Sequence, residues 1–182
     1  MKELSLHILD VVQNSIGAKA SLVEISVYED VKTDSLIIEV EDNGVGMAKE
    51  MTKRVMDPFF TTRTTRKVGL GIPLFAQAAR NCGGDFTIQS EEGKGTKIKA
   101  SFVHSHIDRA PMGGIAETII SLVAVNPSVD FVYRHSVGNK QFLFDTRDIK
   151  QTLEDVPISN PLVLDWIKKF VEDNLREISG GA

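Results

Sequence analysis

The sequence predicts an α+β protein with a small C-terminal α/β appendage, and three features lead to this prediction. Apolar residues recur at helical spacing between residues 3 and 18. Segments 22–42 and 86–103 each contain two alternating runs separated by polar or glycine-rich residues, as expected for β-hairpins. Beyond residue 114, helical spacing flanks a third hairpin pattern. We therefore divide the chain into residues 1–104, a linker at 105–114 and a C-terminal region at 115–182.

The composition is that of an ordinary globular protein. Of the 182 residues, 42% are hydrophobic and 25% are charged, and the formal net charge is −4. Neither the first 104 residues nor the remainder has an excess of basic residues, which argues against a nucleic-acid partner. The single cysteine, Cys82, excludes an intramolecular disulfide and is expected to be a small buried hydrophobe. Asp10 interrupts the first apolar run, so we expect no signal peptide or membrane span and a cytoplasmic location.

The predicted helix at 3–18 has an apolar side and a polar side. The polar stripe contains His7, Asp10, Asn14 and Gly17, at about 100° per residue. Asp10 and Asn14 are four residues apart and are therefore neighbours, and their oxygens suit Mg²⁺ and an ordered water. An ordinary solvated face is the alternative, and these residues alone favour it. A lone histidine such as His7 is more often structural than functional.

The predicted strand ending at Asp42 carries a carboxylate on its apolar face. Alternation places Ile38, Val40 and Asp42 on one side of the strand. A buried carboxylate is costly unless it accepts hydrogen bonds, and the exocyclic amino group of a base is one suitable donor. Gly44 and Gly46 would allow the backbone to approach a flat ligand closely. The alternative is an ordinary β-turn at a strand end, which is the better interpretation of this stretch taken alone.

Two further segments indicate an anion site. After a short predicted helix at 48–54, the run TTRTTRK at 61–67 contains three cations and no acid, which suits a loop that covers an anion. Gly69-Leu70-Gly71-Ile72-Pro73 then opens a predicted helix that runs to about Asn81. Free N–H groups at a helix start bind anions, and the cationic run immediately before them strengthens this interpretation.

Four segments now stand in a fixed order: the Asp10 to Asn14 helix, DNGVGM at 42–47, DPFFTTR at 57–63, and GLGI at 69–72. This order resembles the N, G1, F and G2 boxes of the ATP-binding domain shared by gyrase, Hsp90, histidine kinases and MutL, the GHKL superfamily. The resemblance covers roughly residues 3–103. PFFTTR, GLGIPL and the run from Cys82 to Thr96 are most similar to the catalytic domain of sensor histidine kinases. The first helix is more similar to that of MutL and gyrase.

The resemblance implies a two-layer α/β sandwich, the Bergerat fold, that binds ATP with Mg²⁺. It implies that Asn14 is a ligand of the metal and that Asp42 accepts a hydrogen bond from the adenine amino group. Gly44 and Gly46 would line the base pocket, with Thr96 near the adenine. Gly69, Leu70 and Gly71 are expected at the phosphates. Arg63, Arg66 and Lys67 are also expected there, as part of the lid that covers the nucleotide in this superfamily, but they correspond to it only because they lie next to the matched segments. The same resemblance implies that Met47, Phe60, Thr61 and Ile72 also belong to the nucleotide-binding residues.

Asp10 is the candidate general base. It occupies the place where gyrase and MutL carry a glutamate that activates water, but its side chain is one methylene shorter, which leaves hydrolysis open. The resemblance implies a protein that hydrolyses ATP or transfers its γ-phosphate to a partner protein, as stand-alone serine kinases of the superfamily do. The alternative is a non-catalytic ATP-gated regulatory or dimerisation module. Only nine residues precede Asp10, so we expect no upstream dimerisation helix with a phospho-accepting histidine.

The C-terminal region matches no family that we recognise from its sequence. His104 and His106 lack further metal-ligating residues in register, so we interpret them as incidental. Asn160 followed by Pro161 predicts a helix start. An apolar stripe runs down that helix through Leu164, Ile167, Val171, Leu175 and Ile178. This stripe requires burial, either within the appendage as it closes over the first domain or against a second subunit in a homodimer.

Overall fold

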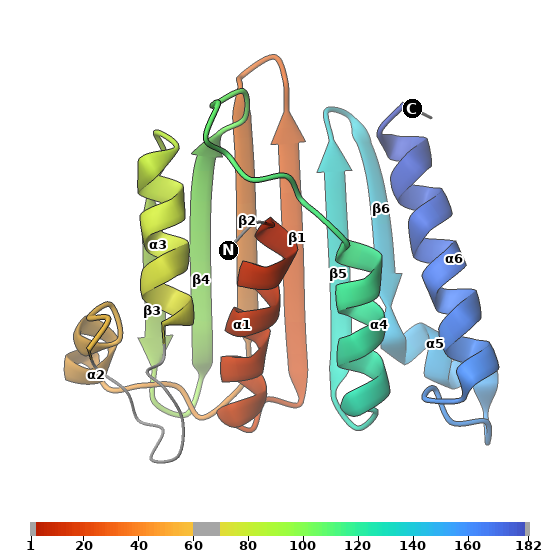
Figure 1. Ribbon diagram of the computed structural model, residues 1–182. Helices are drawn as coiled ribbons and strands as arrows, with labels where there is room; N and C mark the ends of the chain where they lie inside the picture. The colour runs from red at the N-terminus through yellow and green to blue at the C-terminus, as the bar shows by residue number, and fades with distance from the viewer. Residues whose placement is uncertain (1–2, 60–69, 181–182) are drawn as a thin grey trace.

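The fold is a two-layer α/β arrangement, which we describe from a computed structural model for residues 3–59 and 70–180. The strands form one six-stranded sheet in the order β3-β4-β2-β1-β5-β6, with helices packed along it (Figure 1). The strands are β1 (Leu22–Asp30), β2 (Ser35–Asp42), β3 (Phe86–Glu91), β4 (Gly95–Val103), β5 (Asp130–Val137) and β6 (Lys140–Asp145). The helices are α1 (Leu4–Gly17), α2 (Lys49–Arg54), α3 (Gly71–Asn81), α4 (Ile115–Val125), α5 (Thr146–Leu153) and α6 (Pro161–Ile178).

The C-terminal hairpin extends the same sheet as the N-terminal strands. β1 pairs antiparallel with β2 on one side and parallel with β5 on the other, with Val23 opposite Phe131. β6 then pairs antiparallel with β5. The predicted α+β class and the C-terminal α/β element are confirmed, but this element lies beside the first domain rather than over it. The division of the chain at residues 105–114 stays a prediction.

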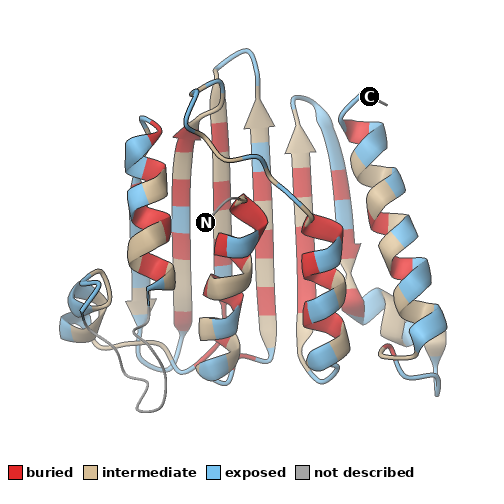
Figure 2. Cartoon of the chain, in the orientation of Figure 1, coloured by how far each residue is buried: buried red, intermediate tan, exposed pale blue. Residues whose placement is uncertain are grey.

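The core lies between the sheet and the helices, and Figure 2 marks its buried residues in red along both layers. In β2 the buried residues alternate, so Ile38, Val40 and Asp42 face the helices as the period-two pattern predicted. Cys82 is also buried, as expected. The opposite face of the sheet is polar, and Lys97 bridges Glu39 and Glu41 there at 3.3 and 3.4 Å. A sheet with one covered and one solvated face requires this alternation.

The linker fixes the start of α1. The N–H groups of Leu4 and Ser5 donate to the carbonyls of Pro111 and Met112 at 2.9 and 2.8 Å. These bonds satisfy two of the N–H groups that a helix leaves unpaired at its first turn. The segment that joins the two halves of the chain therefore also caps the helix that carries Asp10 and Asn14.

The position of His7 confirms that this residue is structural and shows that its part of the polar stripe is not solvated. The sequence places His7 on the polar stripe of α1, for which a solvated face is one interpretation. In the structure only 3% of His7 is exposed. Its ring stacks on Phe75 of α3, with centroids 5.0 Å apart. Burial lowers the pKa of His7 to about 4, so the imidazole is neutral at pH 7. The helix α3 covers this side of α1, so His7 contacts protein rather than solvent and is a structural residue.

The predicted start of α6 is confirmed by its cap. The Asn160 side chain accepts a hydrogen bond from Leu162 N at 2.9 Å, and Pro161 occupies the first turn. The short helix α5 was not predicted, and it begins where Asp145 accepts a hydrogen bond from Arg147 N. Among the helices of residues 3–59 and 70–180, none is both long and apolar enough to cross a bilayer.

Candidate functional site

A cleft of about 620 Å³ lies at the C-terminal end of α1. One wall comes from α1, another from the loop after β2 and from α2, and the remainder from α3 and the β3-β4 hairpin. In Figure 1 this is the lower end of the helix layer, where α1 ends and α3 begins. The lining residues are Val11, Asn14, Ser15, Gly17, Ala18, Asp42, Val45, Gly46, Met47, Ala48, Met51, Val55, Ile72, Glu92, Thr96 and Ile98.

Asp42 is the buried carboxylate of this cleft, with 9% of its surface exposed. One carboxylate oxygen accepts from Ser15 Oγ at 2.6 Å, and the other accepts from Gly44 N at 2.9 Å. A carboxylate has about four acceptor positions, so these two bonds leave capacity for another donor. Because Asp42 also lines the cleft, that capacity is available to a ligand that enters it.

The loop after Asp42 is held by backbone contacts on both sides. Val45 N donates to Ala18 O at 2.9 Å, which ties the loop to the end of α1. Val45 O accepts from Gly93 N at 2.8 Å, which ties it to the turn between β3 and β4. Gly46 has a φ of +68°, and a Cβ there would overlap the carbonyl of Glu91. Only glycine fits this close approach without a rearrangement.

Ser90 is a site residue that the sequence did not predict. Its hydroxyl accepts from Met47 N at 2.8 Å and lies 2.8 Å from Thr96 Oγ1. It therefore joins two predicted site residues that are far apart in the sequence. Ser15 was also missed, although it follows Asn14 directly. Ser15 lies four residues after Val11 on the apolar side of the predicted helix, and a hydroxyl at such a position indicates a buried hydrogen bond.

Asp10 and Asn14 lie one helical turn apart, close to the start of α3. Asn14 lines the cleft. Asp10 packs against Gly71, where an added Cβ would come within 3.0 Å of Asp10 Cβ. Leu70 immediately precedes α3 and is 39% exposed. The structure thus places the predicted base against Gly71 of the predicted phosphate-binding turn, and the predicted metal ligand on the wall of the cleft one helical turn further along α1.

The predicted lid falls outside the described residues. Phe60, Thr61, Arg63, Arg66, Lys67 and Gly69 all belong to the segment 60–69. Their roles stay predictions. Within the described ranges, the structure groups Asn14, Asp42, Gly46, Met47, Ile72 and Thr96 around the cleft, and it places Gly44 directly behind Asp42.

A second polar cluster lies at the other end of the sheet and joins β1 to His104, which directly precedes the linker, and to the C-terminal hairpin. Glu29 of β1 contacts His135 Nε2 at 2.7 Å and His104 Nε2 at 2.9 Å. Tyr133 OH lies 2.6 Å from His135 Nδ1. Hydrogen bonds from His135 and His104 lower the pKa of Glu29 to about 2, against the effect of its burial. His104, predicted to be incidental, thus has a structural contact.

A comparison with protein families identifies the first half of the chain. The model described as "Histidine kinase-, DNA gyrase B-, and HSP90-like ATPase" matches residues 2–106. The chain belongs to this ATPase family. The match covers the whole predicted ATP-binding region and ends at the linker, so the resemblance drawn from the four sequence segments is confirmed.

Similar sequences come from bacterial sensor proteins. A sensor protein of Shewanella frigidimarina is 32% identical over 109 residues, which is 59% of this chain and 17% of that protein. The sensor histidine kinase YxdK of Bacillus subtilis is 31% identical over 109 residues, 56% of this chain and 33% of that protein. The matched part is thus about a third or less of the length of these relatives.

Similar solved structures include the ATPase domain of MutL and the N-terminal domain of a DNA repair protein. The Aquifex aeolicus MutL ATPase domain complexed with ADP has a TM-score of 0.55 at 14% identity, covering 85% of this chain and 70% of that one. The N-terminal domain of a DNA repair protein has a TM-score of 0.54 at 16% identity, covering 79% of this chain and 52% of that one. At this identity the likeness concerns the fold, and it supports the six-stranded architecture of the ATPase family.

Proposed function

We propose that this ATPase-family chain binds ATP with Mg²⁺ in the cleft and transfers the γ-phosphate to a partner protein. The observation that carries the proposal is the position of Asp42, a buried carboxylate that lines the cleft and retains unused acceptor capacity. The cleft volume, about 620 Å³, lies within the range of small-molecule sites. Its largely apolar walls suit a flat aromatic base.

Adenine recognition follows from the chemistry of Asp42. The exocyclic amino group of adenine is a hydrogen-bond donor, and Asp42 is an acceptor held in place by Ser15 and Gly44. A hydrogen bond to a charged group contributes about 1.5–3 kcal/mol, so a ligand that adds a donor to Asp42 is preferred. Thr96 and Met47, joined through Ser90, would form the adjoining wall.

The phosphates and the metal belong at the other end of the cleft. The turn from Leu70 into α3 would present its free N–H groups to the phosphates. Asn14 offers a carboxamide oxygen, which suits Mg²⁺. When bound, this ion would neutralise phosphate charge. The described residues contain no group of three or more His, Cys, Asp or Glu side chains placed to hold a metal. We therefore expect Mg²⁺ to bind with the nucleotide and not by itself.

Phosphoryl transfer to a protein is favoured by those sequence relatives that are named as sensor kinases, among them YxdK. Asp10 would serve as the base that receives the proton of the attacking hydroxyl or water. Its neighbours Asn14 and Gly71 place it near the proposed phosphate end. The second candidate is an ATP-gated module with little turnover. The side chain of Asp10 favours this candidate, because it is one methylene shorter than the water-activating glutamate that gyrase and MutL carry at the corresponding place.

Calorimetric titration with ATP and Mg²⁺ tests the binding proposal. We expect saturable binding that Asp42→Asn weakens by about 10- to 100-fold, equivalent to one buried hydrogen bond to a charged group. Asp155→Asn, an exposed substitution in the loop before α6, is the matched control and should bind as the unaltered chain does. Equal affinity in the Asp42→Asn variant would refute the adenine assignment.

Incubation with γ-labelled ATP separates the two candidates. Label on a protein from cell extract supports phosphotransfer, free phosphate supports hydrolysis, and neither product supports the gated module. Asp10→Asn should abolish whichever product forms while retaining ATP binding by calorimetry. If the product forms at an unchanged rate in this variant, Asp10 is not the base.

A further inference from the structure

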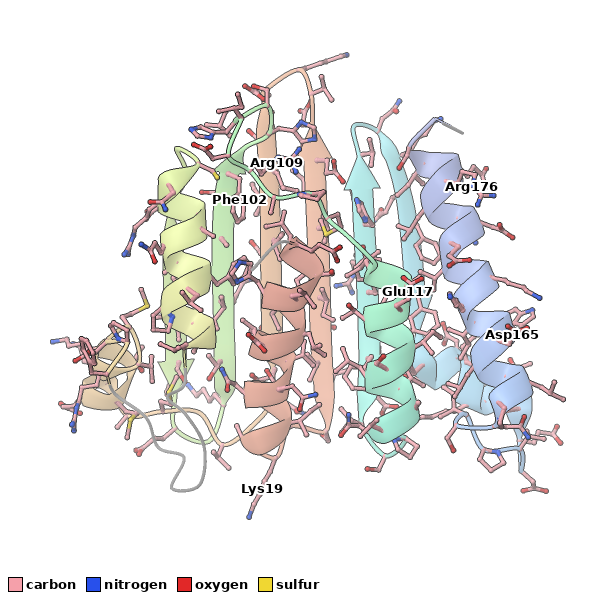
Figure 3. The ribbon with its side chains drawn as sticks, in the orientation of Figure 1. Lys19, Phe102, Arg109, Glu117, Asp165 and Arg176 are labelled. Atoms are coloured by element: carbon pink, nitrogen blue, oxygen red, sulfur yellow. The ribbon has the colours of Figure 1, made fainter. Side chains whose placement is uncertain are left out.

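Helix α6 has one side buried against the sheet and another side that packs against α4. Ile167 and Val171 are fully buried beneath the helix. Lys168 reaches α4 and pairs with Glu117 at 3.3 Å. Figure 3 labels Glu117 on α4 and Asp165 on α6, one on each of these neighbouring helices. The inner side of α6 is therefore fully occupied within the chain.

The remaining flank of α6 is apolar and partly exposed. Successive residues are about 100° apart, so Trp166 and Lys168 project to opposite sides of Ile167. Because Lys168 faces α4, Trp166 faces away from it, beyond the edge of the sheet. Trp166 is 51% exposed and Leu162 is 81% exposed. Trp166 stacks on Phe170 at a centroid distance of 5.1 Å. Phe170 is half-buried and also contacts Phe142 of β6, with ring centroids 5.6 Å apart. Leu162, Trp166 and Phe170 thus form a continuous stripe that is exposed at Leu162 and Trp166, and we call it the outer stripe.

The strand beneath this flank is also unpartnered on one side. β6 is the last strand of the sheet and pairs only with β5 among the described strands. Leu143, at its centre, is 52% exposed on the face opposite the helices. At the other end of the sheet, the helix α2 contacts the edge strand β3. An edge strand with free N–H and C=O groups is a template for another strand.

We propose that a second copy of this chain binds along the edge formed by β6 and α6, related to the first by a two-fold axis near Trp166. The outer stripe is symmetric about Trp166, with Leu162 four residues before it and Phe170 four residues after it. In an antiparallel pair of α6 helices, Leu162 of each copy meets Phe170 of the other. The two β6 strands then run antiparallel, which extends the sheet and its helix layer across both copies.

The charges beside the stripe fit the same arrangement. Asp165 and Lys169 flank the stripe on its outward side and pair within the helix at 3.2 Å, with both side chains largely exposed. In the antiparallel pair, Asp165 of one copy lies opposite Lys169 of the other, so opposite charges meet twice. A partner with an unrelated sequence would not need this internal symmetry. The stripe and its flanking charges together favour a second copy as the occupant.

The first test measures the mass and the fluorescence of the full chain against concentration. We expect a reversible dimer of twice the 20.0 kDa chain mass. Trp166 is the only tryptophan, so its emission should shift to shorter wavelength as the dimer forms. Trp166→Glu should leave the chain monomeric. Ile107→Glu, at a linker residue that is 93% exposed, should leave the dimer intact.

The second test uses charge reversal, which keeps the apolar stripe intact. Asp165→Lys alone and Lys169→Asp alone should each weaken self-association about tenfold, because like charges then meet across the axis. Mixing these two single variants should restore a heterodimer, although the pair within each helix remains broken. A purely intrahelical role for these residues cannot produce that recovery.

Several outcomes would overturn the proposal. These are a monomeric chain at all accessible concentrations, a dimer that survives Trp166→Glu, and mixed charge variants that stay monomeric. Circular dichroism of each variant establishes that it is folded, so loss of structure is not mistaken for loss of the dimer. A chain that is monomeric alone and binds a different protein through α6 would also contradict the proposed occupant.

Discussion

Asp42, the proposed adenine acceptor, is held in place by its surroundings. The Ser15 hydroxyl and the Gly44 amide each donate to one of its two oxygens, so the charge is tolerated in a largely buried position. The same two bonds fix the orientation of the carboxylate. A ligand that enters the cleft therefore meets an acceptor that is already oriented, and little conformational entropy is lost when the hydrogen bond forms.

Glu29 provides a residue-scale prediction with a defined pH dependence. Its pKa is about 2 in the folded chain, below the ordinary value of 4.5, so its contribution to stability is present above pH 4.5 and is lost as the pH falls toward 2. Glu29→Gln should lower the free energy of unfolding by about 2–3 kcal/mol at pH 7. The difference between the variant and the unaltered chain should shrink steadily between pH 4.5 and 3, as measured by urea unfolding.

The control for this prediction is Glu177→Gln, an exposed glutamate near the end of α6. It should change the stability by less than about 0.5 kcal/mol at either pH. A pH-independent loss in Glu29→Gln would mean that the hydrogen bonds to His135 and His104 do not depend on the charge of the carboxylate.

At the scale of elements, the cleft depends on the loop 43–47 being held between α1 and the β3-β4 turn. Gly46→Ala should destabilise the chain by about 3 kcal/mol or more and weaken ATP binding, since the added methyl overlaps the Glu91 carbonyl. Gly93→Ala is the matched control. Gly93 also has a positive φ, +78°, but an added Cβ there has no neighbour within 4 Å, so only about 1 kcal/mol should be lost.

Urea unfolding and calorimetry on both glycine variants decide this point. If Gly46→Ala and Gly93→Ala cost the same, the close approach of the loop to Glu91 has no energetic importance. The positive φ alone would then explain both losses.

Local patterns predicted the elements well where the period was clear. The alternation in β2 placed Asp42 correctly, and the helical spacing gave α1 and α6. The patterns did not predict contacts between residues that are far apart in the sequence. Nothing near Ser90 indicates that its hydroxyl contacts Met47, 43 residues earlier in the chain. The parallel pairing of β1 with β5 is likewise non-local, because it arises only when residues 3–103 and the C-terminal hairpin fold together.

At the scale of the whole molecule, one sheet runs through both halves of the chain. This continuity predicts cooperative unfolding. Trp166 lies in the C-terminal half, whereas the far-ultraviolet circular dichroism reports all helices and strands. We expect the two signals to give the same urea midpoint, and ATP with Mg²⁺ to raise both together. At a concentration where the chain is monomeric, two separated midpoints would show that residues 115–182 unfold as an independent unit.

The base preference of the cleft tests the central claim, that Asp42 selects adenine, most directly. Guanine carries a carbonyl acceptor where adenine carries its amino donor, so Asp42 should repel it. Competition titrations should show the unaltered chain preferring ATP over GTP by about tenfold or more, and Asp42→Asn should abolish or reverse that preference, because the asparagine amide can donate to the carbonyl. Equal affinity of the unaltered chain for both nucleotides, or an unchanged preference in Asp42→Asn, would contradict the assignment.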